Sequence, residues 1–417
     1  QKALVVGGGV AGMSAALAIA DHGYETALVE RTGELGGNLR HIHHTIDGLR
    51  PKELMEGLIA RVESHPNIKL FMNARVAHSG GRVGAFMTSV EKGDGSGETV
   101  EHGATVVATG GQEAKTRSYC YGESDAILTQ REFENRLQSG AITPGSLESV
   151  VMIQCVDSRE TGRNYCSRIC CASALKNALL LKEANPNIDV YVLYRDIMAY
   201  GALEAHYTRA RKAGVLFVQY SLDSKPEVSA SDGRPSVVVH DPILGRTLAL
   251  RPDLLVLSVG VVPDEHGGAA RAFGVETDEN GFYQEAEYKW RPVDSLNGGV
   301  FLCGMGHSPR SIGESIATAE AAAQRALGVI GKKHISSGMG VSEVRQTFCS
   351  LCERCVIACP YGARWIDEEE ERIVVDELAC QGCGACTAAC PNSAAVLRGA
   401  GDHGMLSMID AALDAVY

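Results

Sequence analysis

The fold is indicated first by residues 3–12, which read ALVVGGGVAG. An apolar run is followed by glycines at positions 7, 9 and 12, the spacing of the G-x-G-x-x-G fingerprint. Gly7 allows the tight turn and Gly9 lets the backbone approach a pyrophosphate. Gly12 allows the helix that follows to pack closely on the sheet. The stretch therefore predicts a nucleotide-binding turn between a strand and a helix.

The context of these glycines is the one that a dinucleotide site requires. An Ala-rich helix is expected at 13–21 and a second strand at 26–29. Glu30 ends that strand, about 20 residues after the glycines, where a carboxylate can accept hydrogen bonds from ribose hydroxyls. The alternative is a Gly-rich turn with Glu30 merely at the surface. The combination favours a bound dinucleotide.

The rest of the chain alternates strands and helices, which indicates an α/β fold with parallel sheets covered on both faces. Residues 41–114 are more irregular, and 90–103 suggest a hairpin or a loop. Residues 331–340 have the composition of a linker, and 405–416 have apolar spacing suited to a terminal helix. Further strands are expected at 104–108, 149–154, 190–194, 215–220, 237–240, 254–259 and 300–302, with helices at 172–184 and 312–329.

Composition limits the function classes. A chain of 417 residues is long enough for two to four domains. The formal net charge of −12 argues against a nucleic-acid binder, which would show a basic face. No apolar run reaches the roughly 18–20 residues of a membrane span, and no signal peptide is visible. We therefore expect a cytoplasmic protein whose only membrane association would come through partners.

The 14 cysteines are grouped: four lie within 155–171 and eight within 349–390, with Cys120 and Cys303 apart. Grouped cysteines in a large chain without secretory features indicate metal ligands rather than a disulfide scaffold.

The C-terminal group is an internal repeat. Residues 349–360 and 380–391 both read C-x-x-C-x-x-C-x-x-x-C-P, the pattern of a two-cluster ferredoxin, in which the fourth cysteine of each run binds the other cluster. The acidic run 367–371 between them is expected at a hairpin tip, although a docking role is an alternative. One 4Fe–4S cluster is assigned to Cys349, Cys352, Cys355 and Cys390, and the other to Cys380, Cys383, Cys386 and Cys359.

The first group follows the strand expected at 149–154. Cys155 comes at the strand end, Cys166 and Cys170 are one helical turn apart, and Cys171 is adjacent. Four thiolates suit a third iron–sulfur cluster; zinc and a structural or thiol-redox role are the alternatives. No glycine motif occurs at this turn, so the backbone cannot approach a pyrophosphate and NAD(P)H is not expected to bind there.

Three segments resemble the FAD-contacting motifs of the two-dinucleotide-binding flavoproteins, a family that includes thioredoxin reductase: Glu34–Leu39, Ala108–Gly111 and Val300–Gly304. In that family an Asp follows the glycine of the last motif, whereas Met305 stands there in this chain. Gly306 or His307 could replace that contact, and a structural role for His307 is equally open. The resemblance assigns FAD contacts to Gly7, Gly9, Gly12, Glu30, Arg31, Gly36, Gly37, Asn38, Ala108, Thr109, Gly110, Gly304 and His307.

Nearly the whole chain resembles the A subunit of heterodisulfide reductase, most specifically at Cys155-x10-Cys166-x3-Cys170-Cys171. The resemblance places Lys176 beside the flavin N5, although a helix-surface lysine would look the same. Unlike the longer members, this chain shows no extra N-terminal domain and no ferredoxin insertion in the flavin part, as in bacterial short forms. The domains implied are a FAD-binding unit at 1–115 completed by 295–332, a second Rossmann-like unit at 145–294, a ferredoxin-like unit at 341–400 and a terminal helix at 401–417.

The resemblance implies FAD, three 4Fe–4S clusters and a multisubunit anaerobic oxidoreductase. The expected role is flavin-based electron bifurcation or confurcation, in a heterodisulfide reductase-like or class II benzoyl-CoA reductase-type complex. Partners would be heterodisulfide reductase B- or C-like, hydride-delivering or ferredoxin-type subunits. The alternative is a non-bifurcating flavin and iron–sulfur relay, as in a quinone-modifying complex. An NAD(P)H-dependent disulfide reductase is disfavoured because the second glycine turn is missing.

Overall fold

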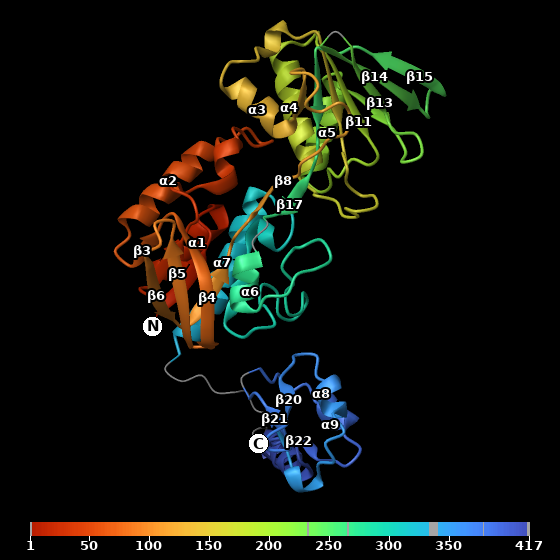
Figure 1. The fold of residues 1–417 in the computed structure, drawn as a ribbon. Coiled ribbons are helices and arrows are strands. Elements are labelled where there is room, and N and C mark those ends of the chain that lie inside the picture. The colour runs from red at the N-terminus through yellow and green to blue at the C-terminus, as the bar shows by residue number, and fades with distance from the viewer. Residues whose placement is uncertain (1, 232, 265–266, 333–340, 378, 415–417) are drawn as a thin grey trace.

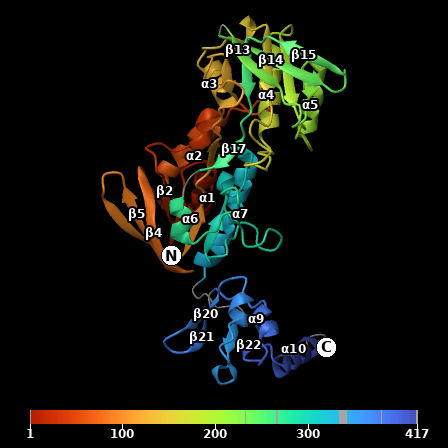
Figure 2. The same cartoon turned by 45° about the vertical axis from the view of Figure 1, so that its right-hand side comes forward.

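The computed structural model describes residues 2–231, 233–264, 267–332, 341–377 and 379–414. Two α/β units and a small C-terminal unit follow one another along the molecule. Both views place the unit built around residues 2–113 and 267–332 in the middle, with the C-terminal unit at one end and the remaining α/β unit at the other (Figures 1 and 2).

The middle unit contains a five-stranded sheet of order β18-β7-β1-β2-β3, in which every pair is parallel. Alternate residues of the central strand enter different cores, because successive side chains of a strand point to opposite faces. Ala3 and Val5 pack with three helices, α1 (Val10–Asp21), α2 (Pro51–Ser64) and α7 (Ile312–Ile330). Leu4 and Val6 pack with a β-meander and helix α6 (Gly267–Phe273) on the other face. The strands are β1 (Lys2–Val6), β2 (Glu25–Val29), β3 (Ile68–Phe71), β7 (Ala104–Val107) and β18 (Val300–Leu302).

Residues 41–114 are more regular than the sequence suggested. The polar helix α2 buries one narrow stripe, with Met55, Leu58 and Val62 among its buried residues, so its apolar pattern is weak. Three antiparallel strands that follow form the meander on the second face of the sheet. The elements of this unit are α1 (Val10–Asp21), η1 (Gly37–His41), α2 (Pro51–Ser64), β4 (Ala74–Arg82), β5 (Ala85–Lys92), β6 (Gly97–His102), α6 (Gly267–Phe273), η3 (Gly304–Gly306) and α7 (Ile312–Ile330).

The second α/β unit repeats this plan with a parallel sheet of order β12-β11-β10-β16-β9. Val150 and Met152 of its central strand pack under helix α4, and Val151 and Ile153 face a three-stranded antiparallel sheet. Its elements are β9 (Ile127–Thr129), α3 (Gln130–Gln138), η2 (Pro144–Ser146), β10 (Ser149–Ile153), α4 (Cys170–Ala184), β11 (Asp189–Tyr194), α5 (Leu203–Lys212), β12 (Leu216–Gln219), β13 (Glu227–Ser231), β14 (Arg234–Asp241), β15 (Arg246–Leu250) and β16 (Leu254–Leu257).

The boundaries of this second unit differ from the expected 145–294. Strand β9 already belongs to its sheet, and α6 packs on the middle unit through Ala269 and Phe273. A two-stranded antiparallel ribbon of β8 (Gly111–Glu113) and β17 (Val261–Pro263) joins the two units, as Figure 1 shows. Both ends of the unit therefore lie earlier in the chain than expected, because three-residue strands carry almost no periodic signal.

The C-terminal unit is built from two two-stranded ribbons and short helices around the cysteine repeat. Arg291 of the middle unit donates a hydrogen bond to Gln381 Oε1 at 2.9 Å. Most of the expected linker, 333–340, lies outside the described residues, as do the last residues of the expected terminal helix. The elements are β19 (Ser342–Val344), η4 (Gln346–Phe348), α8 (Arg354–Ile357), β20 (Arg364–Asp367), β21 (Arg372–Val375), α9 (Ala385–Ala389), β22 (Ala395–Leu397) and α10 (Asp402–Asp414).

Within the described ranges, no helix has both the length and the apolar character that crossing a membrane requires.

Candidate redox centres

The glycine turn after β1 is too tight for any side chain at two of its three positions. A Cβ on Gly12 would lie 1.7 Å from the Gly7 carbonyl oxygen, and one on Gly7 would lie 2.3 Å from the Ala108 oxygen. A Cβ on Gly9, in contrast, would meet nothing within 4 Å. Close packing at Gly7 and Gly12 beside open space at Gly9 is the shape that lets a pyrophosphate reach the backbone.

The N-terminus of α1 is suited to an anion. Gly9 caps the helix without a side-chain hydrogen bond, and the first turn has no acidic residue to neutralise the positive helix end. Glu30 lies beside this turn, with Oε2 accepting from Gly8 N at 2.6 Å and Oε1 accepting from Thr32 N and Oγ1 at 2.8 Å. These bonds hold the carboxylate at the edge where a ribose would lie.

Asn38 connects the three segments that resemble FAD motifs. Its side-chain amide donates to the Gly111 carbonyl at 2.7 Å and lies 3.8 Å from the Met305 sulfur. In the same region Gly36 N donates to Gly8 O at 2.9 Å, which brings Gly36 and Gly37 to the glycine turn. Segments that are more than 260 residues apart in sequence thus meet at one edge of the sheet.

Other predicted FAD contacts lie near this edge with partners of their own. Thr109 hydrogen-bonds to the Tyr283 hydroxyl at 3.0 Å, and Arg31 forms an ion pair with Asp264. Gly304 begins η3, and a Cβ there would lie 2.8 Å from Ala11 Cβ. Ala108 is buried behind the turn, and Gly110 has a positive φ of 81° with open space beside it.

His307 is engaged within the protein at both ring nitrogens. Nε2 lies 3.3 Å from Glu285 Oε2, and Nδ1 lies 2.7 Å from Arg310 Nη2. Burial, followed by the charge of Arg310, lowers the pKa of His307. This geometry favours the structural alternative over a direct flavin contact.

Lys176 is a buried cation rather than a helix-surface lysine. Its ammonium group lies 2.8 Å from Glu134 Oε1 and donates to the His44 carbonyl at 2.9 Å. The side chains of Lys176 and Glu134 are only 7% and 6% exposed. Lys176 therefore connects the second unit to the segment after Gly37–His41 of the middle unit. Glu134 was missed in the sequence because one acidic residue in a polar helix carries no distinguishing signal.

The first cysteine group gathers where β10 ends and α4 begins. Cys155 follows the strand with a positive φ of 58°, and Cys170 and Cys171 are the first two residues of the helix. Burial, and then the neighbouring thiols Cys171, Cys155 and Cys166, raise the pKa of Cys170. The four thiols are therefore electrostatic neighbours, and two of them, Cys170 and Cys171, begin the helix.

Several buried polar side-chain atoms near this group, most of them N–H donors, lack a hydrogen-bond partner in the protein. Gln154 is fully buried and both polar atoms of its amide are unpartnered. Arg159 Nη1 and Arg195 Nε are also buried atoms without a hydrogen-bond partner. Buried unpaired polar atoms cost about 1–3 kcal/mol each, so their concentration here indicates a further polar partner. The soft thiol set with surrounding N–H donors fits an anionic iron–sulfur cluster.

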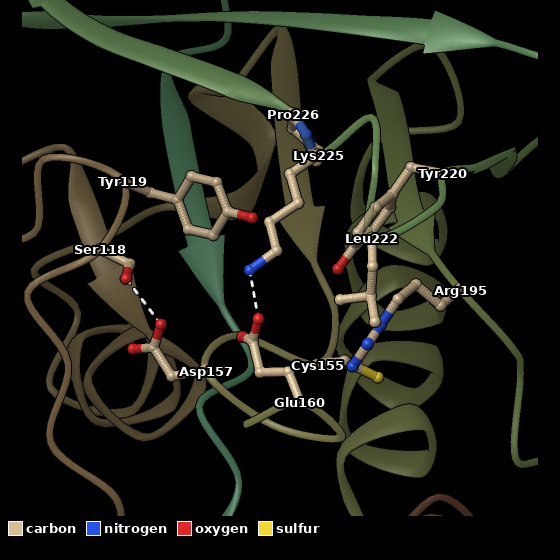
Figure 3. A pocket seen from close by; sticks show the side chains of 10 residues that line it. All are labelled: Ser118, Tyr119, Cys155, Asp157, Glu160, Arg195, Tyr220, Leu222, Lys225 and Pro226. Carbon is tan, nitrogen blue, oxygen red and sulfur yellow. Dashed lines mark hydrogen bonds and ion pairs between the residues drawn. The ribbon is translucent and has the colours of Figure 1, made fainter. Parts of the chain in front are cut away.

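A cavity of about 240 Å³ opens beside Cys155 at the carboxyl edge of the second sheet. Figure 3 shows the Cys155 sulfur next to the Arg195 guanidinium, below the rings of Tyr119 and Tyr220. Ser118 donates to Asp157 at 2.6 Å, and Lys225 pairs with Glu160 across the opening. The lining carries equal numbers of acidic and basic side chains, and so has no preference for an anion.

The C-terminal cysteines line two separate cavities, and each cavity contains one of the sets assigned from the repeat. In each, three thiols come from one half of the repeat and the fourth from the other half. The described residues contain no group of three or more His, Cys, Asp and Glu side chains that could hold a single metal ion. The first cavity includes Cys349, Cys352, Cys355 and Cys390, and the second includes Cys359, Cys380, Cys383 and Cys386.

Two protein-family models match the chain. The model described as pyridine nucleotide-disulphide oxidoreductase matches residues 1–141, and the model described as 4Fe-4S dicluster domain matches residues 348–394. They support FAD in the α/β body and 4Fe–4S clusters in the C-terminal unit.

The curated relatives include several A subunits of heterodisulfide reductases. An iron–sulfur A subunit of the CoB–CoM heterodisulfide reductase of Methanopyrus kandleri is 29% identical over 90% of this chain and 71% of its own length. The A subunit of the H(2):CoB-CoM heterodisulfide,ferredoxin reductase of Methanothermobacter marburgensis has the same identity and coverage. The corresponding iron–sulfur A subunit of Methanocaldococcus jannaschii is 28% identical over 100% of this chain and 78% of its own length.

Solved structures confirm the predicted fold class. Thioredoxin reductase of Lactococcus lactis matches with a TM-score of 0.56 at 20% identity, covering 79% of this chain and 99% of that one. Thioredoxin reductase of T. acidophilum matches with a TM-score of 0.55 at 16% identity, covering 78% and 97%. At these identities the likeness concerns the fold alone.

The glycine turn at residues 7–12, the cysteine sets and the relatives agree, and the predicted resemblance is confirmed. This chain is an oxidoreductase of the flavin and iron–sulfur electron-transfer type, similar to the A subunit of heterodisulfide reductase over nine tenths of its length.

Proposed function

We propose that this chain is the flavin-carrying subunit of a multisubunit anaerobic oxidoreductase, and that it performs electron bifurcation or confurcation with FAD and three 4Fe–4S clusters. The observation that carries the proposal is the replacement of the second nucleotide turn by Cys155 and its neighbours. The middle unit therefore has a glycine turn suited to a flavin nucleotide, and the units on both sides of it carry sets of thiols (Figure 1). FAD exchanges electrons in pairs or singly, whereas a 4Fe–4S cluster exchanges one at a time.

The chain's own residues supply binding and electrostatics. The uncapped end of α1 and the open space at Gly9 would accept the pyrophosphate, and Glu30 would accept from the ribose. Lys176 is the cation proposed to lie by the flavin N5, supported by its burial and its contact with the His44 segment. Its pairing with Glu134 offsets the loss of hydration of the charged ammonium in the interior.

The two C-terminal cavities support the cysteine assignment proposed for that unit. A 4Fe–4S cubane is wider than a single ion, and thiols that surround a space suit it better than thiols that converge on a point. We assign one cluster to each of the two C-terminal sets and a third to Cys155, Cys166, Cys170 and Cys171. The partners would be heterodisulfide reductase B- or C-like, hydride-delivering or ferredoxin-type subunits.

NAD(P)H is not expected at the second unit. The turn after β10 has no glycine from Gln154 to Arg159, and Gln154, followed by Cys155, stands where Gly7 follows β1. Adding NADPH or NADH to the anaerobically purified, oxidised chain should leave the flavin absorbance unbleached. Rapid bleaching would contradict this part of the proposal and favour a pyridine-nucleotide reductase.

The deciding experiment is metal and flavin analysis followed by redox titration of the anaerobically purified chain. We expect one FAD and roughly twelve iron atoms per chain. Flavin one-electron potentials that are strongly crossed support bifurcation, whereas well-separated potentials in the ordinary order support the alternative function, a non-bifurcating relay. Absence of flavin, or zinc in place of iron, would reject both.

A further inference from the structure

The two halves of the C-terminal repeat differ at one buried position. Residues 359–364 read CPYGAR and residues 390–395 read CPNSAA, so Arg364 corresponds to Ala395. The backbone supports this match: Gly362 and Ser393 both adopt a positive φ, of 58° and 51°. Arg364 and Ala395 each begin a strand, and they are 4% and 1% exposed. A guanidinium therefore occupies an interior position that the other half fills with a methyl group.

Arg364 is a buried charge without a carboxylate partner among the described residues. Its Nη2 donates to the Ser342 hydroxyl at 2.8 Å, while Nε and Nη1 have no hydrogen-bond partner. Among the described side chains, no carboxylate forms an ion pair with it. Arginine stays protonated in proteins, and an uncompensated charge in the interior is strongly destabilising. The fold must therefore provide negative charge from a source other than a carboxylate.

The surroundings of the guanidinium point to that charge. Arg364 lines the cavity that contains Cys359, Cys380, Cys383 and Cys386. It also lies beside the other set, because helix α8, which contains Cys355, packs against strand β20, which Arg364 begins, and the guanidinium lies close to the Cys355 thiol. Ser342 connects the same network, since Cys386 Sγ lies 3.2 Å from its hydroxyl. Arg364 thus lies within electrostatic reach of both thiol sets.

We propose that Arg364 is a buried cation shared by the two C-terminal clusters, with its free N–H groups directed at cluster sulfur, and that it raises the reduction potentials of both. The inference rests on the proposed cluster assignment. A cubane with four thiolates is an anion that gains one further negative charge on reduction, so a nearby cation and N–H donors stabilise the reduced form more than the oxidised form. The guanidinium also reduces the repulsion between two adjacent anions.

The test uses the full chain with its clusters assembled anaerobically, and compares Arg364→Met, Arg364→Lys and Arg372→Met. Arg372 begins the partner strand of the same hairpin, is half exposed and pairs with Glu370, so its variant removes the same charge outside the interior. Midpoint potentials are measured by redox titration followed by electron paramagnetic resonance, with iron content determined on each sample.

We expect Arg364→Met to shift both C-terminal midpoints to more negative values, Arg364→Lys to shift them less, and Arg372→Met to leave them near the unmodified values. Unchanged midpoints in iron-replete Arg364→Met would overturn the inference, as would an equal shift in Arg372→Met. A shift of one cluster alone would overturn the sharing. If Arg364→Met does not hold iron, the midpoints of Arg364→Lys decide, because that variant keeps the charge and loses the fork of N–H groups. A shift of both midpoints to more negative values then supports the inference, and unchanged midpoints overturn it. An unmodified chain without iron would instead reject the proposed function.

Discussion

The two α/β units place different chemistry at the same point of the same fold. In both, the central strand pairs in parallel with two neighbours, and the turn after it faces the carboxyl edge of the sheet. That turn begins with Gly7 in the middle unit and with Gln154-Cys155 in the second unit. The sheet therefore supplies the position, while the residue type at the turn decides between a nucleotide and a thiol-bound group.

Backbone conformation makes the contrast sharper. Gly7 adopts a φ of 112° at no steric cost, because glycine has no Cβ. Cys155, Asp157 and Arg159 all adopt φ values near 50–60°, where a residue with a side chain is strained by about 1–2 kcal/mol. The hydrogen bonds of Asp157 with Thr116 and Ser118 hold this loop in place. The second turn therefore retains a strained shape that presents a thiol, a strain that a plain structural loop would avoid.

The largest effect is expected from placing a side chain at a tightly packed glycine of the turn after β1. Gly12→Val should abolish FAD binding and folding of the middle unit, because its first added carbon would lie 1.7 Å from the Gly7 oxygen. Gly9→Ala is the matched control for folding, since its methyl group would enter open space. It should leave the circular dichroism spectrum unchanged while weakening FAD binding. A well-folded, flavin-replete Gly12→Val variant would contradict the geometry assigned to this turn.

Removing one thiol of the second turn should eliminate a whole cluster. Cys155→Ser is expected to lower the iron content by about four atoms per chain while FAD remains bound, because the two centres are in different units. Cys120→Ser is the control: this thiol lies in the second unit outside the set, 3.5 Å from the Val228 carbonyl, where a hydroxyl can replace it. Equal iron contents in the two variants would reject the cysteine assignment.

The buried ion pair between Lys176 and Glu134 in the second unit should come next in magnitude. Lys176→Met leaves the Glu134 carboxylate buried without its cation, a change that costs about 3–5 kcal/mol. Lys182→Met on the same helix is the control, since that lysine is more exposed. Denaturant unfolding measures both variants. Adding Glu134→Gln to Lys176→Met should restore part of the stability, and failure to do so would show that the pair is not the reason for the loss.

The smallest expected effect is on the pH dependence of stability, and it comes from Glu113 in the ribbon between the units. Burial raises the pKa of Glu113 to about 7, against hydrogen bonds from Thr129 and Arg131. Because the folded pKa lies above the unfolded value of 4.5, the stabilisation is complete below pH 4.5 and is lost as the pH rises through 7. The total change is at most about 3 kcal/mol.

Glu113→Gln, which stays neutral, should remove this component of the pH dependence. The urea midpoint of the unmodified chain, measured relative to that of the variant, is expected to fall as the pH rises from 4.5 through 7. Glu91→Gln at an exposed position controls for general charge effects. A constant difference between the unmodified chain and Glu113→Gln across this range would show that folding does not raise the pKa of Glu113.

Much of the site could be predicted from local sequence. The glycine spacing, the cysteine repeat and the Cys155 to Cys171 set depend on residues that are neighbours along the chain, where bond geometry limits the outcomes. The polar helix α2 and the short strands β8, β9 and β17 were not predicted as elements, because they are stabilised by contacts with distant segments rather than by a pattern of their own.

The order of the glycines and cysteines was sufficient to indicate which cofactors this chain can hold, because tight turns and thiol ligands require particular residue types at short spacing. Long-range packing decided the rest. It buried Lys176 against Glu134, brought Asn38 to Gly111 and Met305, and placed Arg364 in the wall of a cavity that contains four thiols. A buried charge is stabilised by groups that are close in space and remote in sequence, and only the folded chain specifies which groups those are.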